Sequence, residues 1–187
     1  MAESGRVRVG IVGCGDISGA HLDGYASDGR ATVVAVADSS SSAAELRAEE
    51  FGIARVYSSY GEMLDREELD AVSVCTPPPA HREIAEAAAA RGLHILCEKP
   101  LAMSVADGES MVAIARRSGV VLMTAFCQRF MGHVIETRDL IRAGKLGEVH
   151  QFRFRRGENT SYEQSWIGDP DRGGGLFWES GDRKSVV

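Results

Sequence analysis

The sequence lacks any apolar run of the roughly 18 residues that a membrane-spanning helix needs. It also lacks a basic excess, because 21 Lys and Arg stand against 27 Asp and Glu, for a net charge of −6. Binding to nucleic acid or to an anionic membrane surface in general needs a basic footprint, so we expect neither partner. The first residues lack the apolar segment of a signal peptide. A cytoplasmic location is therefore expected.

Cysteine is scarce and is not arranged for metal binding. The four cysteines form no CxxC pair and no zinc spacing, and each falls in or just after a predicted strand. We expect them to be small buried hydrophobic side chains, with no disulfide and no metal site. They are Cys14, Cys75, Cys97 and Cys127.

What the first 126 residues do have is a regular alternation of short apolar segments and helical patterns. The apolar segments do not alternate in polarity, as is typical of parallel strands covered by helices on both faces. The sequence therefore predicts an α/β fold, a Rossmann-type doubly wound parallel sheet over 1–126, with ligands outside the carboxyl ends of the strands. The expected strands are 6–12, 31–37, 55–57, 70–75, 93–97 and 120–126, and the expected helices are 17–27, 42–51, 60–64, 80–91 and 105–117.

The pattern changes after residue 126. A helix is expected over 129–143, and residues 149–155 then alternate in polarity, with Phe152 and Phe154 on one face. Such alternation is typical of an antiparallel, half-exposed strand. We expect 127–187 to be the first part of an α+β substrate domain that is truncated, because one strand cannot make a sheet.

A glycine loop follows the first expected strand and opens the first expected helix. Gly13 and Gly15 allow a tight turn and a close approach of the backbone to a pyrophosphate at the helix N-terminus. Ser18 stands where a third small residue permits close packing. An ordinary glycine turn is the alternative, but the strand-loop-helix context favours nucleotide binding. The predicted contacts extend to Asp16 and Ile17.

Asp38 ends the second expected strand. A carboxylate there can accept both ribose hydroxyls of NAD and repels a 2′-phosphate. Four serines follow it, and Arg47 lies a helix away. NAD is therefore expected in preference to NADP, although a serine beside the aspartate can also face a phosphate. The alternative role for Asp38 is a solvated turn residue.

Thr76 and Pro77 end the fourth expected strand, and His81 begins the following helix. A proline there removes a backbone donor and stiffens the loop against a flat ring. Thr76 and Pro77 are predicted to line the cofactor. For His81 we consider two roles equally: a contact with the cofactor, and an exposed position at the start of the helix.

Lys99 stands between Glu98 and Pro100 at the end of the fifth expected strand. The proline keeps Lys99 out of helical geometry, so its side chain can project from the strand end. A lysine in a partly dry pocket beside a nicotinamide suits proton transfer to or from an alcohol during hydride transfer. The alternative is a surface lysine, which the strand-end position argues against.

Together these motifs resemble the Gfo/Idh/MocA family of NAD(P)-dependent oxidoreductases, which act mostly on sugars, cyclitols and related polyols. The match spans nearly the whole chain. It comprises Gly13-Cys14-Gly15 with His21, Ala37-Asp38, Thr76-Pro77 with His81, Glu98-Lys99-Pro100, Gln128-Arg129-Phe130, and Ser165-Trp166 with Gly173-Gly174-Gly175.

The resemblance implies roles for individual residues. Lys99 would be the catalytic and substrate-orienting residue, Glu98, Thr76 and Pro77 would line the cofactor, and Arg129 would approach the nicotinamide or the substrate. The family's glycine triplet leads into Asp-x-Gly-x-His, whereas this chain reads Glu179-Ser180-Gly181-Asp182-Arg183. Glu179 can stand for the catalytic aspartate. Arginine stays protonated and cannot replace the histidine as a base.

The resemblance therefore implies an NAD(P)-dependent oxidoreductase acting on the CH–OH group of a sugar or polyol, with this fragment inactive. The family also implies a homo-oligomer formed through the missing C-terminal sheet. Two alternatives remain. One is an NAD-dependent glycoside hydrolase that works by transient oxidation, and the other is a non-catalytic nucleotide-binding protein. Analysis of the products formed from an aryl glycoside would distinguish the first alternative from a dehydrogenase. NAD titration followed by a turnover test would distinguish the second.

Overall fold

The computed structural model describes residues 5–151 and 153, which fall into two compact units with the boundary between Ala125 and Phe126. The first unit contains a sheet and five α-helices, and the second contains one further α-helix. The boundary lies one residue from the expected one. That the second unit is the start of a substrate domain stays a prediction.

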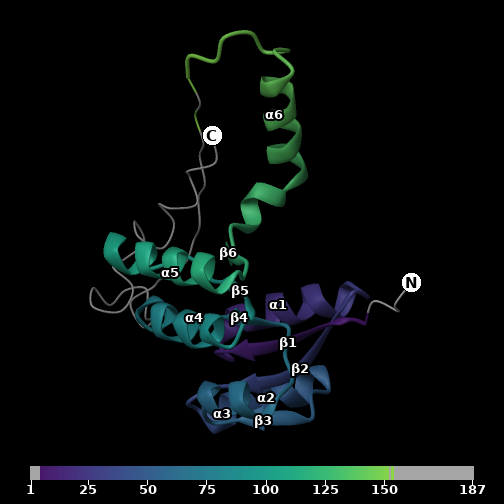
Figure 1. Cartoon of the computed structure of the whole chain (residues 1–187). Coiled ribbons are helices and arrows are strands. Elements are labelled where there is room, and N and C mark those ends of the chain that lie inside the picture. The colour runs from purple at the N-terminus through teal and green to yellow at the C-terminus, as the bar shows by residue number, and fades with distance from the viewer. Residues whose placement is uncertain (1–4, 152, 154–187) are drawn as a thin grey trace, which may run out of the picture. The chain divides into compact units, whose positions relative to one another are not determined.

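A six-stranded sheet, parallel throughout, forms the centre of the first unit (Figure 1). The strand order is β3-β2-β1-β4-β5-β6, so the chain builds outward from β1 in one direction and then from β4 in the other. This confirms the predicted doubly wound fold, and the reversal lies between β1 and β4. The strands are β1 (Val7–Val12), β2 (Ala31–Ala37), β3 (Arg55–Tyr57), β4 (Ala71–Val74), β5 (His94–Cys97) and β6 (Leu122–Thr124).

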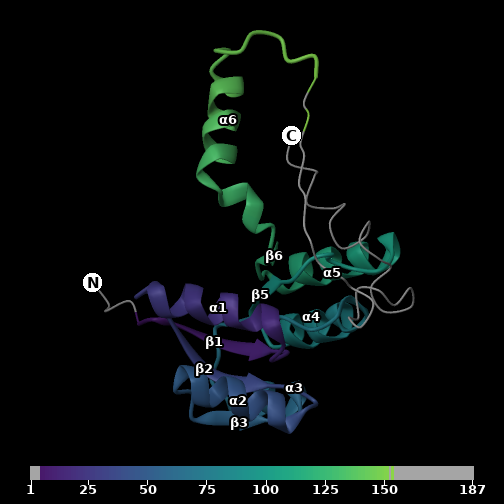
Figure 2. The same ribbon diagram turned by 180° about the vertical axis from the view of Figure 1, so that it is seen from behind.

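Helices cover both faces of the sheet, as Figures 1 and 2 show from opposite sides. Leu22 of α1 and Ala44 of α2 pack with Val9 and Ile11 of β1 in one apolar cluster. The helices α3, α4 and α5 contribute to a second cluster with other side chains of the sheet. Burial on both faces explains why the strands lack polar alternation. The helices are α1 (Asp16–Ser27), α2 (Ser41–Phe51), α3 (Tyr60–Arg66), α4 (His81–Ala90) and α5 (Val105–Ser118).

The elements of the first unit begin and end within two residues of their expected bounds, and β6 is two residues shorter than the expected 120–126 at each end. Gly119 adopts a left-handed conformation after α5, and the Val120 N–H donates to the Ala115 carbonyl at 3.0 Å. Val120 therefore belongs to the turn that ends the helix and not to the strand.

The second unit begins with a 3₁₀ turn, Cys127–Phe130, followed by α6 (Gly132–Arg142). The turn delays the start of the helix relative to the expected 129–143. The strand expected over 149–155 is not formed at residues 149–151 or 153. The described residues of the second unit contain no other strand that could pair with it. Its remaining residues, Phe152 among them, lie outside the described part of the chain.

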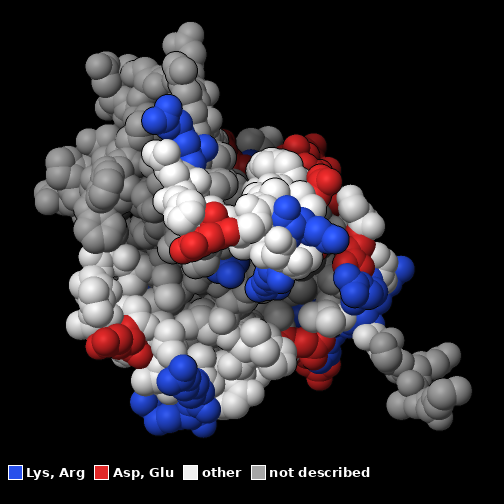
Figure 3. Space-filling view, turned by 90° about the horizontal axis from the view of Figure 1, so that it is seen from above, with Lys and Arg blue, Asp and Glu red and all other residues white. Residues whose placement is uncertain are grey.

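Three of the four cysteines are buried as expected, but Cys127 is exposed, so that expectation was wrong for one of them. Burial raises the pKa of the Cys14 thiol to about 11 and holds the pKa values of Cys75 and Cys97 above their ordinary value. Among the described residues no cluster of His, Cys, Asp and Glu could hold a metal ion. The same residues contain no helix long and apolar enough to cross a membrane. Figure 3 shows basic and acidic side chains interspersed on one face.

Candidate cofactor and active site

The glycine loop begins where β1 ends, at the strand reversal. Gly13 has a φ of +92°, and a Cβ placed on it would lie 2.7 Å from the carbonyl carbon of Cys75 and 2.7 Å from the Thr76 nitrogen. Its own N–H donates to the Ala37 carbonyl at 2.8 Å. Only glycine suits this position, because both the conformation and the close approach to the segment after β4 exclude a side chain.

The loop leads directly into α1. Gly15 is the N-cap residue, and within the described part of the chain no side chain caps this end of the helix and no atom lies within 4 Å of a Cβ placed on Gly15. Asp16 and Ile17 are exposed in the first turn, whereas Ser18 is buried and donates from its hydroxyl to the Gly15 carbonyl at 2.6 Å. An uncapped helix start with open space before it suits a phosphate, which its N–H groups and dipole attract.

Asp38 links the end of β2 to the glycine loop. One carboxylate oxygen accepts from the Cys14 N–H at 2.7 Å, and the other accepts from the Ser40 N–H at 2.8 Å. A carboxylate has about four acceptor positions, so these two bonds leave capacity for ribose hydroxyls. Because the Asp38 side chain bonds to the glycine loop, it is not simply a solvated turn residue.

Arg47 extends from α2 to the glycine loop, which the sequence did not reveal. Its Nη2 donates to the Gly15 carbonyl at 3.2 Å, and its Nη1 pairs with Glu50 at 2.6 Å. The Nε is buried and has no hydrogen-bond partner among the residues that the structure describes. A cation thus lies beside the loop although Arg47 is a helix away in sequence. This contact could be predicted only by knowing how α2 is placed relative to the glycine loop.

Thr76 presents a polar atom in need of a partner. Its Oγ1 is buried and makes no hydrogen bond in the described structure. A buried hydroxyl without a partner costs free energy, and a bound ligand can supply the missing bond. Pro77 follows at the N-terminal side of a short 3₁₀ turn, Pro78–Ala80.

His81 is completely buried at the start of α4. Its Nε2 lies 2.8 Å from the Thr76 carbonyl oxygen, and its Nδ1 lies 3.0 Å from that of Pro100. The alternative of a surface histidine is therefore wrong. Burial lowers the pKa of His81, and the backbone carbonyls only partly oppose this effect. Because both ring nitrogens face carbonyl oxygens, a direct cofactor contact through them is disfavoured.

Glu98 and Lys99, which follow β5, are each only 7% exposed. One oxygen of the Glu98 carboxylate accepts from His21 Nε2 at 2.9 Å, and the other accepts from the Lys99 backbone N–H at 3.0 Å. Burial raises the pKa of Glu98, but these bonds and the nearby positive charges outweigh it and hold the pKa below the ordinary value. The peptide bond between Lys99 and Pro100 is cis.

The contacts link several of the expected site residues of the first unit. Gly13 touches the Cys75–Thr76 backbone, His81 joins Thr76 to Pro100, and His21 joins α1 to Glu98. Arg129 lies in the second unit, and Glu179 lies outside the described residues. Which of these residues touch cofactor or substrate stays a prediction.

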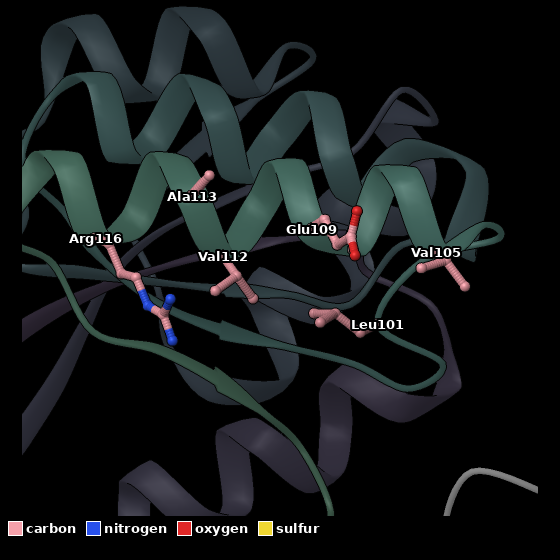
Figure 4. A pocket seen from close by; sticks show the side chains of 7 residues that line it. Leu101, Val105, Glu109, Val112, Ala113 and Arg116 are labelled. Atoms are coloured by element: carbon pink, nitrogen blue, oxygen red, sulfur yellow. The ribbon is translucent and has the colours of Figure 1, made fainter.

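A separate hollow of about 400 Å³ lies along α5 (Figure 4). Leu101, Val105 and Val112 give it an apolar lining, with Glu109 and Arg116 among the lining residues. Of the predicted site residues that the structure describes, none lines this hollow. We therefore place the candidate site at the glycine loop and the ends of β4 and β5.

A family model described as the oxidoreductase family with an NAD-binding Rossmann fold, Gfo/Idh/MocA, matches residues 7–126. The chain belongs to this family. The matched residues cover the sheet, the glycine loop and the Glu98-Lys99 segment. They therefore form the NAD-binding domain, as the resemblance implied.

Curated relatives show the same kinship. The chain is 34% identical over 142 residues to D-apiose dehydrogenase of Paraburkholderia graminis, a match that covers 76% of this chain and 38% of the relative. It is 36% identical over 148 residues to D-glucoside 3-dehydrogenase of Escherichia coli, covering 79% of this chain and 42% of the relative. The chain thus spans less than half the length of these relatives.

Solved structures share the fold over most of the chain. An NAD-binding oxidoreductase from Klebsiella pneumoniae has a TM-score of 0.81 and 30% identity, covering 93% of this chain and 50% of that one. The WlbA dehydrogenase from Bordetella pertussis, solved with NADH and UDP-GlcNAcA, has a TM-score of 0.72 and 32% identity, covering 76% and 43%.

The residues present fit NAD. Gly13 admits no side chain, the space before Gly15 is open, and the N-terminus of α1 has no side-chain cap. Thr76 offers a buried hydroxyl without a partner, and Asp38 keeps acceptor capacity beside the loop. The open space at the glycine loop would admit a pyrophosphate, and Asp38 and Thr76 would offer polar atoms for hydrogen bonds at the same edge of the sheet.

Proposed function

We propose that this chain is the cofactor-binding part of an NAD-dependent oxidoreductase that acts on a CH–OH group of a sugar, cyclitol or related polyol. The observation that carries the proposal is the placement of Lys99. It is nearly buried at the carboxyl end of β5. The preceding residue, Glu98, is bonded to His21 of α1, the helix that starts at the glycine loop. The following residue, Pro100, is bonded to His81, which also contacts the segment after β4. A lysine fixed beside a nucleotide loop suits proton transfer.

Each group then has a defined task. NAD, when bound, supplies an acceptor for the hydride that leaves the substrate carbon. Lys99 takes the proton from the hydroxyl oxygen as the carbonyl forms, and it returns the proton in the reverse reaction. Glu98 holds the Lys99 backbone through its carboxylate. The loop Gly13–Gly15 and Asp38 hold the pyrophosphate and the ribose.

NAD is proposed as the preferred cofactor, with NADP as the weaker alternative. The support is Asp38, whose carboxylate is held beside the loop and would repel a 2′-phosphate. Arg47 opposes this preference because its guanidinium also lies at the loop. However, that guanidinium bonds to a carbonyl and to Glu50, so we weigh Asp38 more heavily.

The substrate class is proposed from the relatives, whose names specify sugars and polyols. Arg129 is proposed to approach the nicotinamide or substrate, and Glu179 to stand for the family's catalytic aspartate. Because the chain spans less than half of D-apiose dehydrogenase and D-glucoside 3-dehydrogenase, we propose that this chain alone binds NAD without turning over substrate.

Fluorescence titration with NADH tests cofactor binding by the 187-residue chain, and absence of binding would reject the proposed function. A second titration is made on the Lys99→Met variant, whose NADH affinity should stay within a few-fold of the unchanged chain. In a version extended to the length of the relatives, Lys99→Met should lower turnover of a polyol by about 10²–10⁴-fold. Near-normal turnover would remove Lys99 from the mechanism.

A further inference from the structure

The ring of His81 spans two loops of the candidate site. Nε2 lies 2.8 Å from the carbonyl oxygen of Thr76, which follows β4. Nδ1 lies 3.0 Å from the carbonyl oxygen of Pro100 and 3.3 Å from that of Leu101, which follow β5. The residue is fully buried. Water therefore does not compete for either nitrogen, and the ring connects the two loops directly.

The contacts of the two ring nitrogens indicate which of them carries the proton. Carbonyl oxygens only accept hydrogen bonds, and a neutral imidazole has one N–H donor and one lone pair. A lone pair on Nδ1 would face two carbonyl oxygens, whereas a lone pair on Nε2 would face one. We therefore assign the proton of the neutral ring to Nδ1, with His81 donating to Pro100 and Leu101.

Lys99 is held on its other side by Glu98. The Glu98 N–H donates to the Val74 carbonyl at 2.9 Å, which continues the pairing of β5 with β4. The Glu98 carboxylate is bonded to His21 of α1. The residue before Lys99 is thus fixed by the sheet and α1, and the residue after it by the His81 ring of α4.

We propose that His81 is a positioning residue that sets the orientation of Lys99 by holding the backbone carbonyls of Pro100 and Leu101. This role rests on the proposed function, in which Lys99 relays the proton. His81 then acts through the backbone and does not touch the substrate. Removing its donor leaves the segment after Lys99 without the link to α4, and the Lys99 side chain loses its fixed direction.

The chain offers a direct probe because it contains only three lysines, Lys99, Lys145 and Lys184. Lysine labelled with ¹³C at Cε gives three resonances by NMR, and Lys99→Arg identifies the Lys99 signal. Lys99 is nearly buried and Lys145 is exposed. We expect the Lys99 resonance of the 187-residue chain without cofactor to be well separated from that of Lys145.

Three substitutions distinguish loss of the His81 hydrogen-bond donor from loss of the volume of its side chain. The amide nitrogen of His81→Asn occupies roughly the place of Nδ1, that of His81→Gln reaches roughly the place of Nε2, and His81→Leu fills space without a donor. We expect His81→Asn to keep the Lys99 resonance near its original position. His81→Gln and His81→Leu should move it toward that of Lys145.

His94→Asn is the matched control. His94 is an exposed histidine at the opposite end of β5, where its Nδ1 accepts from the Val121 N–H at 3.0 Å. This change should leave the Lys99 resonance in place. An unchanged Lys99 resonance in all three His81 variants, or an equal shift in all three, would overturn the proposal.

One measurement needs no variant. The ¹⁵N shifts of the His81 ring in the unchanged chain at neutral pH report which nitrogen carries the proton, and a proton on Nε2 alone would overturn the proposal even if variants fail to fold. NADH titration of the same samples separates the two claims. Binding of NADH with an insensitive Lys99 resonance rejects only the role of His81, whereas absence of binding rejects the proposed function.

Discussion

The Glu98 carboxylate lies 2.9 Å from the Nε2 of His21, and both side chains are about nine-tenths buried. Removing His21 deprives the buried carboxylate of one hydrogen bond, and hydrogen bonds to charged groups contribute about 1.5–3 kcal/mol. We expect His21→Ala to lower the free energy of unfolding by that order, as measured by urea denaturation. The control is Arg66→Ala, because the Arg66–Glu62 pair is solvent-exposed and is expected to contribute at most about 0.5 kcal/mol. Equal losses in the two variants would contradict this prediction.

The lowered pKa of Glu98 predicts a pH dependence of stability. The folded carboxylate binds its proton at lower pH than the unfolded one. The stabilisation is therefore fully present above the ordinary glutamate pKa and is lost as the pH falls through that value toward the folded one. We expect Glu98→Gln to flatten the dependence of the unfolding free energy on pH in this acidic window. A variant with an unchanged slope there would rule out the Glu98 contribution.

His81 predicts a second loss of stability at milder acidity. Burial lowers its folded pKa, so the unfolded chain takes up a proton first as the pH falls below about 6.5, the usual histidine value. Stability should decline from there toward the folded pKa. His81→Asn should remove this part of the slope, whereas the exposed His94→Asn should retain it. Urea denaturation at several pH values between neutrality and the acidic window makes the comparison.

Gly13 and Gly15 should respond differently to alanine. A Cβ on Gly13 meets backbone atoms at 2.7 Å in a left-handed conformation, so Gly13→Ala should lower the melting temperature and NADH affinity together. A Cβ on Gly15 meets no atom of the described residues within 4 Å, so Gly15→Ala should keep the melting temperature but weaken binding of NADH, whose phosphates need that space. Calorimetry and NADH titration distinguish the two effects. A Gly15→Ala chain with normal NADH affinity would move the phosphate site elsewhere.

Asp38→Asn should weaken NADH and narrow its advantage over NADPH. The substitution removes the charge that repels a 2′-phosphate, while the side-chain oxygen still accepts one backbone hydrogen bond. Titrations of both cofactors on the variant and on the unchanged chain measure the preference. Equal affinities for NADH and NADPH in the unchanged chain would reject the NAD preference. They would indicate that Arg47 offsets the repulsion between Asp38 and a 2′-phosphate.

The fold could be predicted because most of the parallel strands are short, mainly apolar runs, and β2 and β5 each end just before an acidic residue. Asp38 and Glu98 follow such runs, and the order of strands and helices then places both at one edge of the sheet. The glycine loop was recognisable for the same reason, since its position between strand and helix is a local property. The short β6 was not, because whether Val120 joins the strand or the helix turn depends on one backbone hydrogen bond.

The partners within the site could not be predicted. His21 and Glu98 are far apart in sequence, and their contact depends on how α1 turns over the sheet. The burial of His81 and the return of Arg47 to the glycine loop have the same origin, because helix rotation decides where a long side chain points. The sequence identified the residues that end strands and singled out His21 and His81, but it did not predict the contacts of these histidines or the role of Arg47.

The position of β1 between β2 and β4 has a consequence for synthesis of the chain. During translation, Gly13 and Asp38 emerge early and can meet as soon as β1 pairs with β2. The opposite wall of the crevice, at Cys75 and Thr76, does not exist until the fourth strand has left the ribosome and inserted beside β1. A nascent chain that lacks β4 therefore also lacks the Cys75–Thr76 backbone, which lies beside Gly13 in the folded domain.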